Sequence, residues 1–300
     1  MNASAPARLL PPATLARLAN LELIARTAVE GFLTGLHRSP RHGFSQEFKE
    51  YRAYVEGDDP RFVDWNVYAR TERTYVRRFE GETNTRLIVL LDASASMGYG
   101  SQPVTKLQYG KFLAAALAWL AARQHDPVGL IVFDERIRTY RAPASRPGSL
   151  AGVIHAIDAV TPGGATDLSR CFSALGEHLK RRGLVAVISD LYCDAQAVSN
   201  AVRPLAYHGH DVMLFQLLDP QEVRPQWREN VVLEDVETGK KLNVSPQYVE
   251  TEYRRRLDAH LDALRAGAAR AGAHQMLIET HEPLDGALRR YLAFRRGRRF

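Results

Sequence analysis

From residue 85 onward, short apolar segments alternate with segments of helical periodicity, and this alternation constrains the fold more than any other feature. Four apolar segments without charged residues span 87–91, 128–133, 184–189 and 212–218. Continuous apolar segments are typical of strands buried on both faces. Segments of helical spacing span 106–123, 149–160, 167–181 and 195–207. The pattern predicts an α/β fold, with a mostly parallel sheet covered by helices on both faces. Residues 136–140 are the expected hairpin partner of the second strand.

The regions on either side of this core have different patterns. Residues 14–36 have the apolar spacing of one amphipathic helix. Residues 37–84 are rich in charged and aromatic side chains and predict a β extension, with strands at 46–56 and 74–80 and a helical turn at 64–70. After residue 220 we expect a hairpin at 231–244, a helix at 247–271, a strand at 274–280 and a final helix from 283. The predicted segments are a tail and helix (1–36), a charged β extension (37–84), a core (85–220) and a C-terminal part packed on the core (221–300).

Composition narrows the class of protein. Two cysteines without a C-x-x-C pair exclude a disulfide scaffold and a cysteine-rich zinc site, and no apolar run is long enough for a membrane span. We therefore expect a soluble cytoplasmic protein. The net charge is +6, but six arginines in residues 281–300 face only two acidic residues there. This basic tail is interpreted as a solvated helix end, with partner binding as the alternative, and nucleic-acid binding is not expected.

Carboxylate and hydroxyl side chains follow two of the predicted strands. Asp92, Ser94 and Ser96 come at the end of the first apolar segment, Asp190 follows the third, and Thr166 stands just before a predicted helix. Ligands of open parallel sheets sit beyond the carboxyl ends of the strands, so we expect these five side chains to converge. Oxygen donors of this kind suit Mg²⁺ or Mn²⁺. These five side chains leave the coordination shell of the ion incomplete. An Asp or Glu side chain of a protein partner can occupy the remaining position.

These residues also resemble a known type of site. The pattern D-A-S-A-S at 92–96, with the later Thr166 and Asp190, resembles the metal-ion-dependent adhesion site of a von Willebrand factor A-like domain. From about residue 35 to the C-terminus the chain resembles the bacterial domain-of-unknown-function 58 family. The most specific matching segment is G-D-D-P-R-F-V-D-W at 57–65, and further matches are D-P-V-G-L-I-V-F, R-G-L-V-A-V-I-S-D-L and G-H-D-V-M-L-F-Q-L-L-D-P-Q-E.

The resemblance implies a von Willebrand factor A-like fold with an N-terminal β extension, and a non-enzymatic adaptor working with a MoxR-type AAA+ ATPase in the assembly or remodelling of other proteins. It also implies that the serines, and the threonine when a ligand is bound, coordinate the metal directly, whereas the aspartates act through water. The chain departs from many such domains at Leu191, where they have glycine after the last aspartate. It also has no N-terminal membrane helix of the kind some related proteins carry.

Alternative interpretations remain open for several residues. Asp92, Ser94, Ser96 and Thr166 are also residue types that cap helix N-termini. A partner-docking surface or a structural charge network would explain the charged block formed by Arg52, Asp58, Asp59, Arg61, Asp64, Trp65 and Arg70. Asp219 and Glu222 are either a second site or a helix start. Two alternative functions are a metal-dependent phosphoester hydrolase, although Ser94 replaces the second carboxylate of an Asp-x-Asp motif, and a metal-free scaffold.

Overall fold

The four apolar segments form the centre of a six-stranded sheet, in the order β10-β7-β6-β3-β4-β5. The strands are β3 (Leu87–Asp92), β4 (Val128–Phe133), β5 (Ile137–Ala144), β6 (Leu184–Ser189), β7 (Asp211–Leu218) and β10 (Ala273–Glu279). All neighbouring pairs are parallel except β4 and β5, which form the expected antiparallel pair at one edge. The chain order reverses at β3, so the loops after β3 and β6 lie at the switch point of the sheet.

This computed structural model describes residues 10–18, 20–37, 47–55, 63–80, 86–165, 168–175, 178–235 and 239–297. The described residues fall into two compact units. The larger contains those between 10 and 32 and between 86 and 297, and the smaller those between 33 and 80. None of the described helices is long and apolar enough to cross a membrane.

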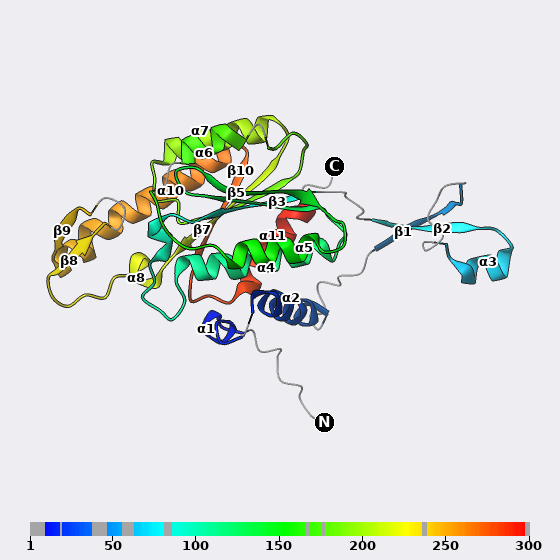
Figure 1. The fold of residues 1–300 in the computed structure, drawn as a ribbon, viewed down its shortest axis with the longest axis horizontal. Coiled ribbons are helices and arrows are strands. Elements are labelled where there is room, and N and C mark those ends of the chain that lie inside the picture. Colours follow the sequence, from blue (N-terminus) through cyan, green and yellow to red (C-terminus); the bar gives the residue numbers. More distant parts are fainter. Residues whose placement is uncertain are drawn as a thin grey trace, which may run out of the picture. The chain divides into compact units, whose positions relative to one another are not determined.

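Helices cover both faces of the sheet (Figure 1). One face carries α6 (Leu168–Leu175), α7 (Ala195–Tyr207) and α10 (Arg254–Arg270), and the other α4 (Lys106–Ala122), α5 (Ser149–Asp158) and α11 (Leu284–Gly297). The alanine-rich α4 is buried on nearly all sides, as expected of a helix that is apolar all round. A Cβ at Gly110 would lie 3.2 Å from a methyl group of Leu91, so glycine lets α4 approach the sheet closely. The predicted fold class is confirmed.

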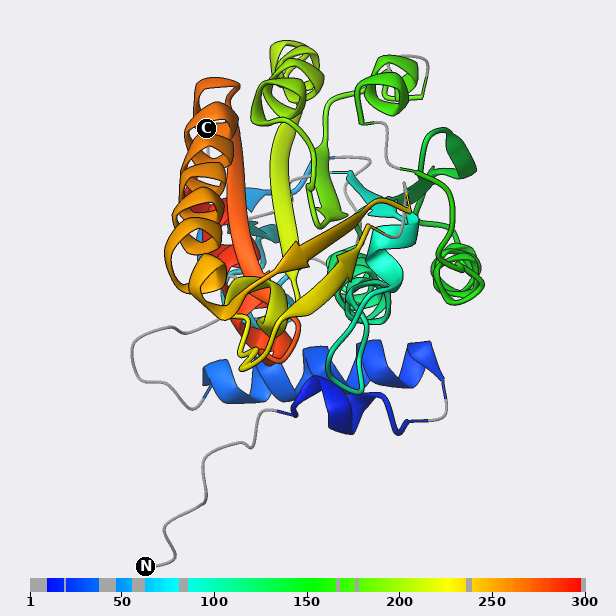
Figure 2. The ribbon, with the colours of Figure 1, turned by 90° about the vertical axis from the view of Figure 1, so that its left-hand side faces the viewer.

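Two N-terminal helices, one short and one of 17 residues, replace the single helix predicted over 14–36. They are α1 (Pro12–Leu15) and α2 (Leu21–His37). The side chain of Asn20 accepts a hydrogen bond from the amide of Leu23 at 2.7 Å, so Asn20 caps a new helix where the apolar periodicity continues. Figures 1 and 2 show α2 beside α4, on the side away from the sheet. There the Arg289 guanidinium lies 5.8 Å from the centre of the Phe32 ring.

The smaller unit confirms the strands and helical turn expected there. Strands β1 (Glu47–Ala53) and β2 (Tyr75–Glu80) pair antiparallel, and α3 (Trp65–Thr71) lies between them in sequence. Asp64 is buried and its carboxylate accepts a hydrogen bond from the amide of Val67 at the start of α3, whereas Trp65 is 61% exposed. Asp58, Asp59 and Arg61, and the side chain of Arg52, lie outside the described residues.

The segment after β7 contains a hairpin and an interrupted helix. After α8 (Pro220–Val223), strands β8 (Val231–Glu234) and β9 (Lys241–Val244) form the predicted hairpin, seen in front of the larger unit in Figure 2. The helix predicted over 247–271 consists of α9 (Pro246–Tyr248), a π-helical turn η3 (Val249–Tyr253) and α10. The helix predicted over 167–181 was too long. The described helix α6 spans Leu168–Leu175, and residues 179–181, which the structure also describes, are not helical.

Candidate metal centre

Asp92 ends the central strand β3, and its carboxylate is fully buried. One oxygen accepts a hydrogen bond from the amide of Ser94 at 2.8 Å, and the other accepts from the hydroxyl of Ser189 at 2.6 Å. No lysine, arginine or histidine of the described residues pairs with it. A buried carboxylate without a positive partner is costly unless a cation binds or a proton is taken up.

The surroundings of Asp92 oppose its negative charge. Burial raises the pKa of its carboxyl group, and the nearby charge of Asp190 raises it further, to about 7. The hydrogen bonds from Ser189 and Ser94 act in the opposite direction but are smaller effects. Two carboxylates held close together in a buried place are a common arrangement at cation sites, because the ion removes the repulsion between them.

Ser94 and Ser96 lie on the loop and short 3-10 helix η2 (Ala95–Gly98) that follow β3. Ser94 stands at the position before η2, but its side chain makes no capping hydrogen bond. Instead its Oγ lies 3.1 Å from the Oγ of Ser96. Neighbouring ligands of an octahedral Mg²⁺ lie about 2.9 Å apart, given metal–oxygen distances of about 2.0–2.1 Å. The capping interpretation of Ser94 is therefore wrong, and the spacing of the two hydroxyls suits one small cation.

Backbone hydrogen bonds join the loop after α5 to the loop after β3. The amide of Ala95 donates to the carbonyl of Gly164, and the amide of Gly163 donates to the carbonyl of Ala93, each at 2.9 Å. Gly164 has a φ of +79°, and a Cβ at this position would clash with the carboxylate of Asp134. The loop that leads to Thr166 is thus anchored beside Asp92. Thr166 itself lies outside the described residues.

Asp190 follows β6 and is also fully buried, but it has a partner that the sequence analysis did not foresee. The ammonium group of Lys106 lies 2.8 Å from Oδ2 of Asp190 and 2.8 Å from Oε1 of Glu222. Lys106 is the first residue of α4 and is only 1% exposed. Burial lowers its pKa, but the two carboxylates outweigh burial, so the pKa of Lys106 is raised overall and its ammonium form is favoured.

Aromatic rings surround the same ammonium group. The Nζ of Lys106 lies 5.0 Å from the ring centre of Tyr192 and 5.9 Å from that of Tyr99, within the range of cation–π attraction. A lysine in the first turn of a helix opposes the helix dipole. This unfavourable position is the feature of the sequence from which carboxylate partners of Lys106 could have been predicted. Ser189, at the end of an apolar strand, gave no comparable signal.

Asp219 and Glu222 form a capping box at the start of α8. The carboxylate of Asp219 accepts from the amide of Gln221, and the carboxylate of Glu222 accepts from the amide of Asp219, each at 2.8 Å. The helix-start interpretation is thus confirmed. Glu222 has an additional role, since its other oxygen binds Lys106. Burial raises the pKa of Glu222 although Lys106 opposes this effect.

Leu191 occupies the position where many related sites have glycine. Its φ is +53°, a left-handed conformation that glycine adopts freely and that costs leucine about 1–2 kcal/mol. The amide of Leu191 donates to the hydroxyl of Ser189 at 3.0 Å, and its side chain is buried. The backbone therefore turns after Asp190 as a glycine would, and burial of the leucine side chain offsets the strain.

The described residues fit a divalent cation in part. Asp92, Ser94 and Ser96 offer one uncompensated carboxylate and two closely spaced hydroxyls, whereas one oxygen of Asp190 is already bound to Lys106. No group of three or more His, Cys, Asp and Glu side chains able to hold a metal occurs within the described ranges. Any ion here depends on hydroxyl ligands, as Mg²⁺ and Mn²⁺ accept. Bound at this place, it would neutralise Asp92 and attract a further oxygen ligand.

Comparisons with known proteins place the chain among relatives of unassigned function. An uncharacterized protein of Mycobacterium tuberculosis is 29% identical over 315 residues, which cover 97% of this chain and 96% of that protein. Among solved structures, the conserved hypothetical protein BatB from Bacteroides thetaiotaomicron has a TM-score of 0.47 and 14% identity, over 70% of this chain and 97% of that one. The SpRpn10 VWA domain has a TM-score of 0.40 and 11% identity, over 69% and 94% of the two chains.

A family model described as "Protein of unknown function DUF58" matches residues 50–266. The matched range begins in the charged β extension, continues through the whole metal-site region and ends inside α10. It includes the four segments quoted for the resemblance to domain-of-unknown-function 58, and the resemblance from about residue 35 to the C-terminus extends beyond it at both ends. The chain therefore belongs to the DUF58 family.

Proposed function

We propose that this chain is a metal-dependent protein-interaction module that acts without catalysing a reaction. In this proposal Asp92, Ser94 and Ser96, with Thr166 and Asp190 from neighbouring loops, hold Mg²⁺ or Mn²⁺ at the carboxyl edge of the sheet. An Asp or Glu side chain of a protein partner completes the ion's shell. The resemblance to von Willebrand factor A-like domains supports a role in protein interaction rather than in catalysis.

The observation that carries the proposal is the state of Asp92. Its carboxylate is fully buried, has no basic partner within the described ranges, and lies next to two hydroxyls with the spacing of metal ligands. A protein interior tolerates such a charge poorly. A divalent cation would satisfy Asp92 and use the lone pairs of both serines.

The family resemblance also suggests a partner protein and a location in the cell. We infer a MoxR-type AAA+ ATPase as the partner, a role in assembly or remodelling of other proteins, and a cytoplasmic location. This inference is supported by the family resemblance of the motif-bearing segments, and the same family is matched over 50–266. A partner that supplies one carboxylate to a metal would be held through a small, strong contact at the centre of a wider surface.

A metal-free scaffold is a second candidate, and Lys106 is the observation that favours it. The Lys106 ammonium already neutralises part of the negative charge near Asp190, and an internal ammonium can take the place of a metal ion. The hydrolase alternative has less support, because the described residues offer few carboxylates for the two-metal or water-activating arrangements of such enzymes. Partner binding that requires a divalent ion would support the adhesion site over the scaffold. Hydrolysis of a phosphodiester by the purified protein would support the hydrolase instead.

The direct experiment is a pull-down from the native host, with Mg²⁺ or with EDTA, using wild type and Asp92→Asn. This substitution keeps the shape of the side chain and removes its charge. Asp262→Asn, on the exposed face of α10, is the matched control. We expect an AAA+ ATPase to be retained by wild type and by the control only with divalent ion, and to be lost with Asp92→Asn. Retention by all variants in EDTA would contradict the metal-dependent mechanism.

A further inference from the structure

We propose that a basic cavity at the amino ends of β3 and β6 binds a phosphate-bearing small molecule. The cavity has a volume of about 350 Å³ and belongs entirely to the larger unit. Its polar lining comes from Arg86, Tyr140, His178, Lys180 and Arg181. Arg86 immediately precedes β3, and Lys180 and Arg181 precede β6. The cavity therefore lies at the opposite end of these strands from Asp92 and Asp190, and the proposal is independent of the metal site.

The described lining of the cavity is basic. Three cationic side chains line the cavity, and none of the described residues in its lining is acidic. No hydrogen bond or ion pair of the Arg86, Lys180 or Arg181 side chains occurs within the described ranges. Other basic residues of the larger unit are paired, for example Arg138 with Asp134 and Arg224 with Glu279.

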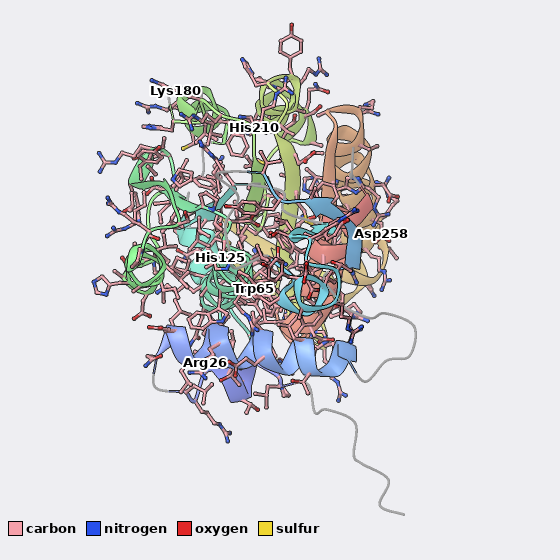
Figure 3. The ribbon with its side chains drawn as sticks, turned by 90° about the vertical axis from the view of Figure 1, so that its right-hand side faces the viewer. Arg26, Trp65, His125, Lys180, His210 and Asp258 are labelled. Carbon is pink, nitrogen blue, oxygen red and sulfur yellow. The ribbon has the colours of Figure 1, made fainter. Side chains whose placement is uncertain are left out.

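Like charges gathered in a concave place repel one another, and the surrounding protein concentrates their field. Figure 3 shows the Lys180 side chain at the surface beside α6, where an anion can reach it. A phosphate group matches this arrangement, since it carries more than one negative charge and accepts bidentate hydrogen bonds from arginine. The cavity thus favours an oligoanion over a neutral ligand.

The backbone holds the cationic residues together before any ligand binds. The amide of Leu184 donates to the carbonyl of Arg86 at 2.8 Å. A Cβ at Gly183 would lie 2.8 Å from the same carbonyl oxygen, so glycine is needed for this close approach. The segment that carries Lys180 and Arg181 is therefore fixed against the residue that begins β3. Such preorganisation lowers the entropy lost on binding.

An aromatic surface forms another wall of the cavity. The rings of Tyr140 and His178 lie 4.3 Å apart between centroids, with an angle of 36° between their planes. Tyr140 is 39% exposed, on the edge strand β5. Exposed aromatic faces stack with planar ligand rings. A nucleotide has both features that the cavity recognises, phosphates for the cations and a ring for Tyr140.

The size of the cavity distinguishes between classes of anion. A volume of about 350 Å³ lies at the lower end of the range of about 300–1,000 Å³ for small-molecule sites. A nucleic-acid strand or a lipid surface would need a basic face extended over many residues. A concave site with three cations instead suits a compact ligand with two or three phosphate groups.

The test is a calorimetric titration of the full chain with tripolyphosphate, ATP and a glutamate-rich peptide, in EDTA and at low salt. EDTA keeps the metal site empty, so the result does not depend on the proposed function. We expect saturable binding of both phosphate compounds, with ATP the tighter ligand. The double variant Lys180→Ala/Arg181→Ala should weaken both at least about tenfold, and Tyr140→Ala should remove the advantage of ATP.

The matched control is Arg203→Ala/Arg270→Ala. These two arginines are exposed on α7 and α10, and the change lowers the net charge by the same amount. It should alter either affinity less than about twofold. Equal weakening by the control would show that net charge alone attracts the phosphates, and would overturn the proposal. The proposal is also overturned if neither phosphate compound saturates the protein, or if only the acidic peptide binds.

Discussion

The ammonium nitrogen of Lys106 lies 2.8 Å from Oδ2 of Asp190, and both side chains are about 1% exposed. This buried pair joins the first turn of α4 to the end of β6, and the bond to Glu222 extends it to α8. The carboxylates of Asp92 and Asp190 therefore have different surroundings although they end neighbouring strands. Asp190 has an internal cation, and Asp92 has none within the described residues.

Replacing Lys106 by methionine should destabilise the fold strongly. The change leaves Asp190 and Glu222 buried without their cation, and breaking such a pair from one side costs about 3–5 kcal/mol. Urea unfolding measures this loss, with Lys111→Met as the control on the same helix. Among the described residues, the ammonium of Lys111 binds the carbonyl of Asp158 alone, so its loss should cost about 0.5–1.5 kcal/mol.

The Lys106→Met variant should also differ from wild type in its affinity for Mg²⁺. Removal of the ammonium charge should tighten Mg²⁺ binding several-fold, because a cation that repels the ion is gone. Saturating Mg²⁺ should then restore part of the lost stability. A variant that is destabilised but insensitive to Mg²⁺ would favour the metal-free scaffold.

Ser189→Ala should weaken the anchoring of Asp92. The variant loses the 2.6 Å hydrogen bond to the carboxylate and the bond that the Ser189 hydroxyl accepts from Leu191. Hydrogen bonds to charged groups contribute about 1.5–3 kcal/mol. Ser199→Ala is the matched control, because Ser199 is a buried serine whose hydroxyl donates to the carbonyl of Gly267 at 3.3 Å and contacts no carboxylate among the described residues. Its replacement should cost about 0.5–1.5 kcal/mol, and equal costs in urea unfolding would argue against a special role for Ser189.

Gly164→Ala and Gly148→Ala form a second matched pair. Both glycines have left-handed φ angles, +79° and +81°. A Cβ at Gly148 meets no atom within 4 Å, whereas a Cβ at Gly164 would clash with the Asp134 carboxylate. Gly148→Ala should therefore cost only the conformational strain of about 1–2 kcal/mol. Gly164→Ala should cost more and should also weaken Mg²⁺ binding, because Gly164 anchors the Ala95 loop. Thermal unfolding with and without Mg²⁺ measures both effects.

His210 should make the fold sensitive to acid. It is buried, and one ring nitrogen bonds to the carbonyl of Leu179. Burial lowers its pKa below the ordinary value of 6.5, so at low pH the unfolded chain takes up a proton that the folded chain resists. This contribution to stability is complete above pH 6.5 and is lost as the pH falls below it. Urea unfolding over this range should show a steeper acid loss for wild type than for His210→Gln, and identical slopes would contradict this assignment.

Local sequence patterns predicted the sheet well. The apolar runs that became β3, β4, β6 and β7 are buried on both faces, and such strands have an unambiguous pattern. The residues Asp92, Ser94, Ser96 and Asp190 could be placed at one edge because parallel strands end together. The interruption at Asn20 was missed, since apolar periodicity continues across it while a capping side chain starts a new helix.

The contacts made by Lys106 could not be predicted in the same way. Its partners lie 84 and 116 residues away in sequence, and only the packing of α4 on the sheet brings them together. The hydrogen bond from Ser189 to Asp92 likewise spans 97 residues between two strands. Long-range polar contacts of this kind have no periodic signature, so they appear only once the fold is known.

Binding of Mn²⁺ to the purified chain, followed by the electron paramagnetic resonance of the free ion, tests the metal site most directly. We expect one Mn²⁺ site in wild type, from which Mg²⁺ displaces Mn²⁺. The affinity for Mn²⁺ should be at least about tenfold lower in Ser94→Ala/Ser96→Ala. Asp92→Asn should bind no Mn²⁺. Circular dichroism would confirm that each variant is folded. Wild type that binds no Mn²⁺, or a folded Asp92→Asn variant that binds it as tightly as wild type, would contradict the metal centre.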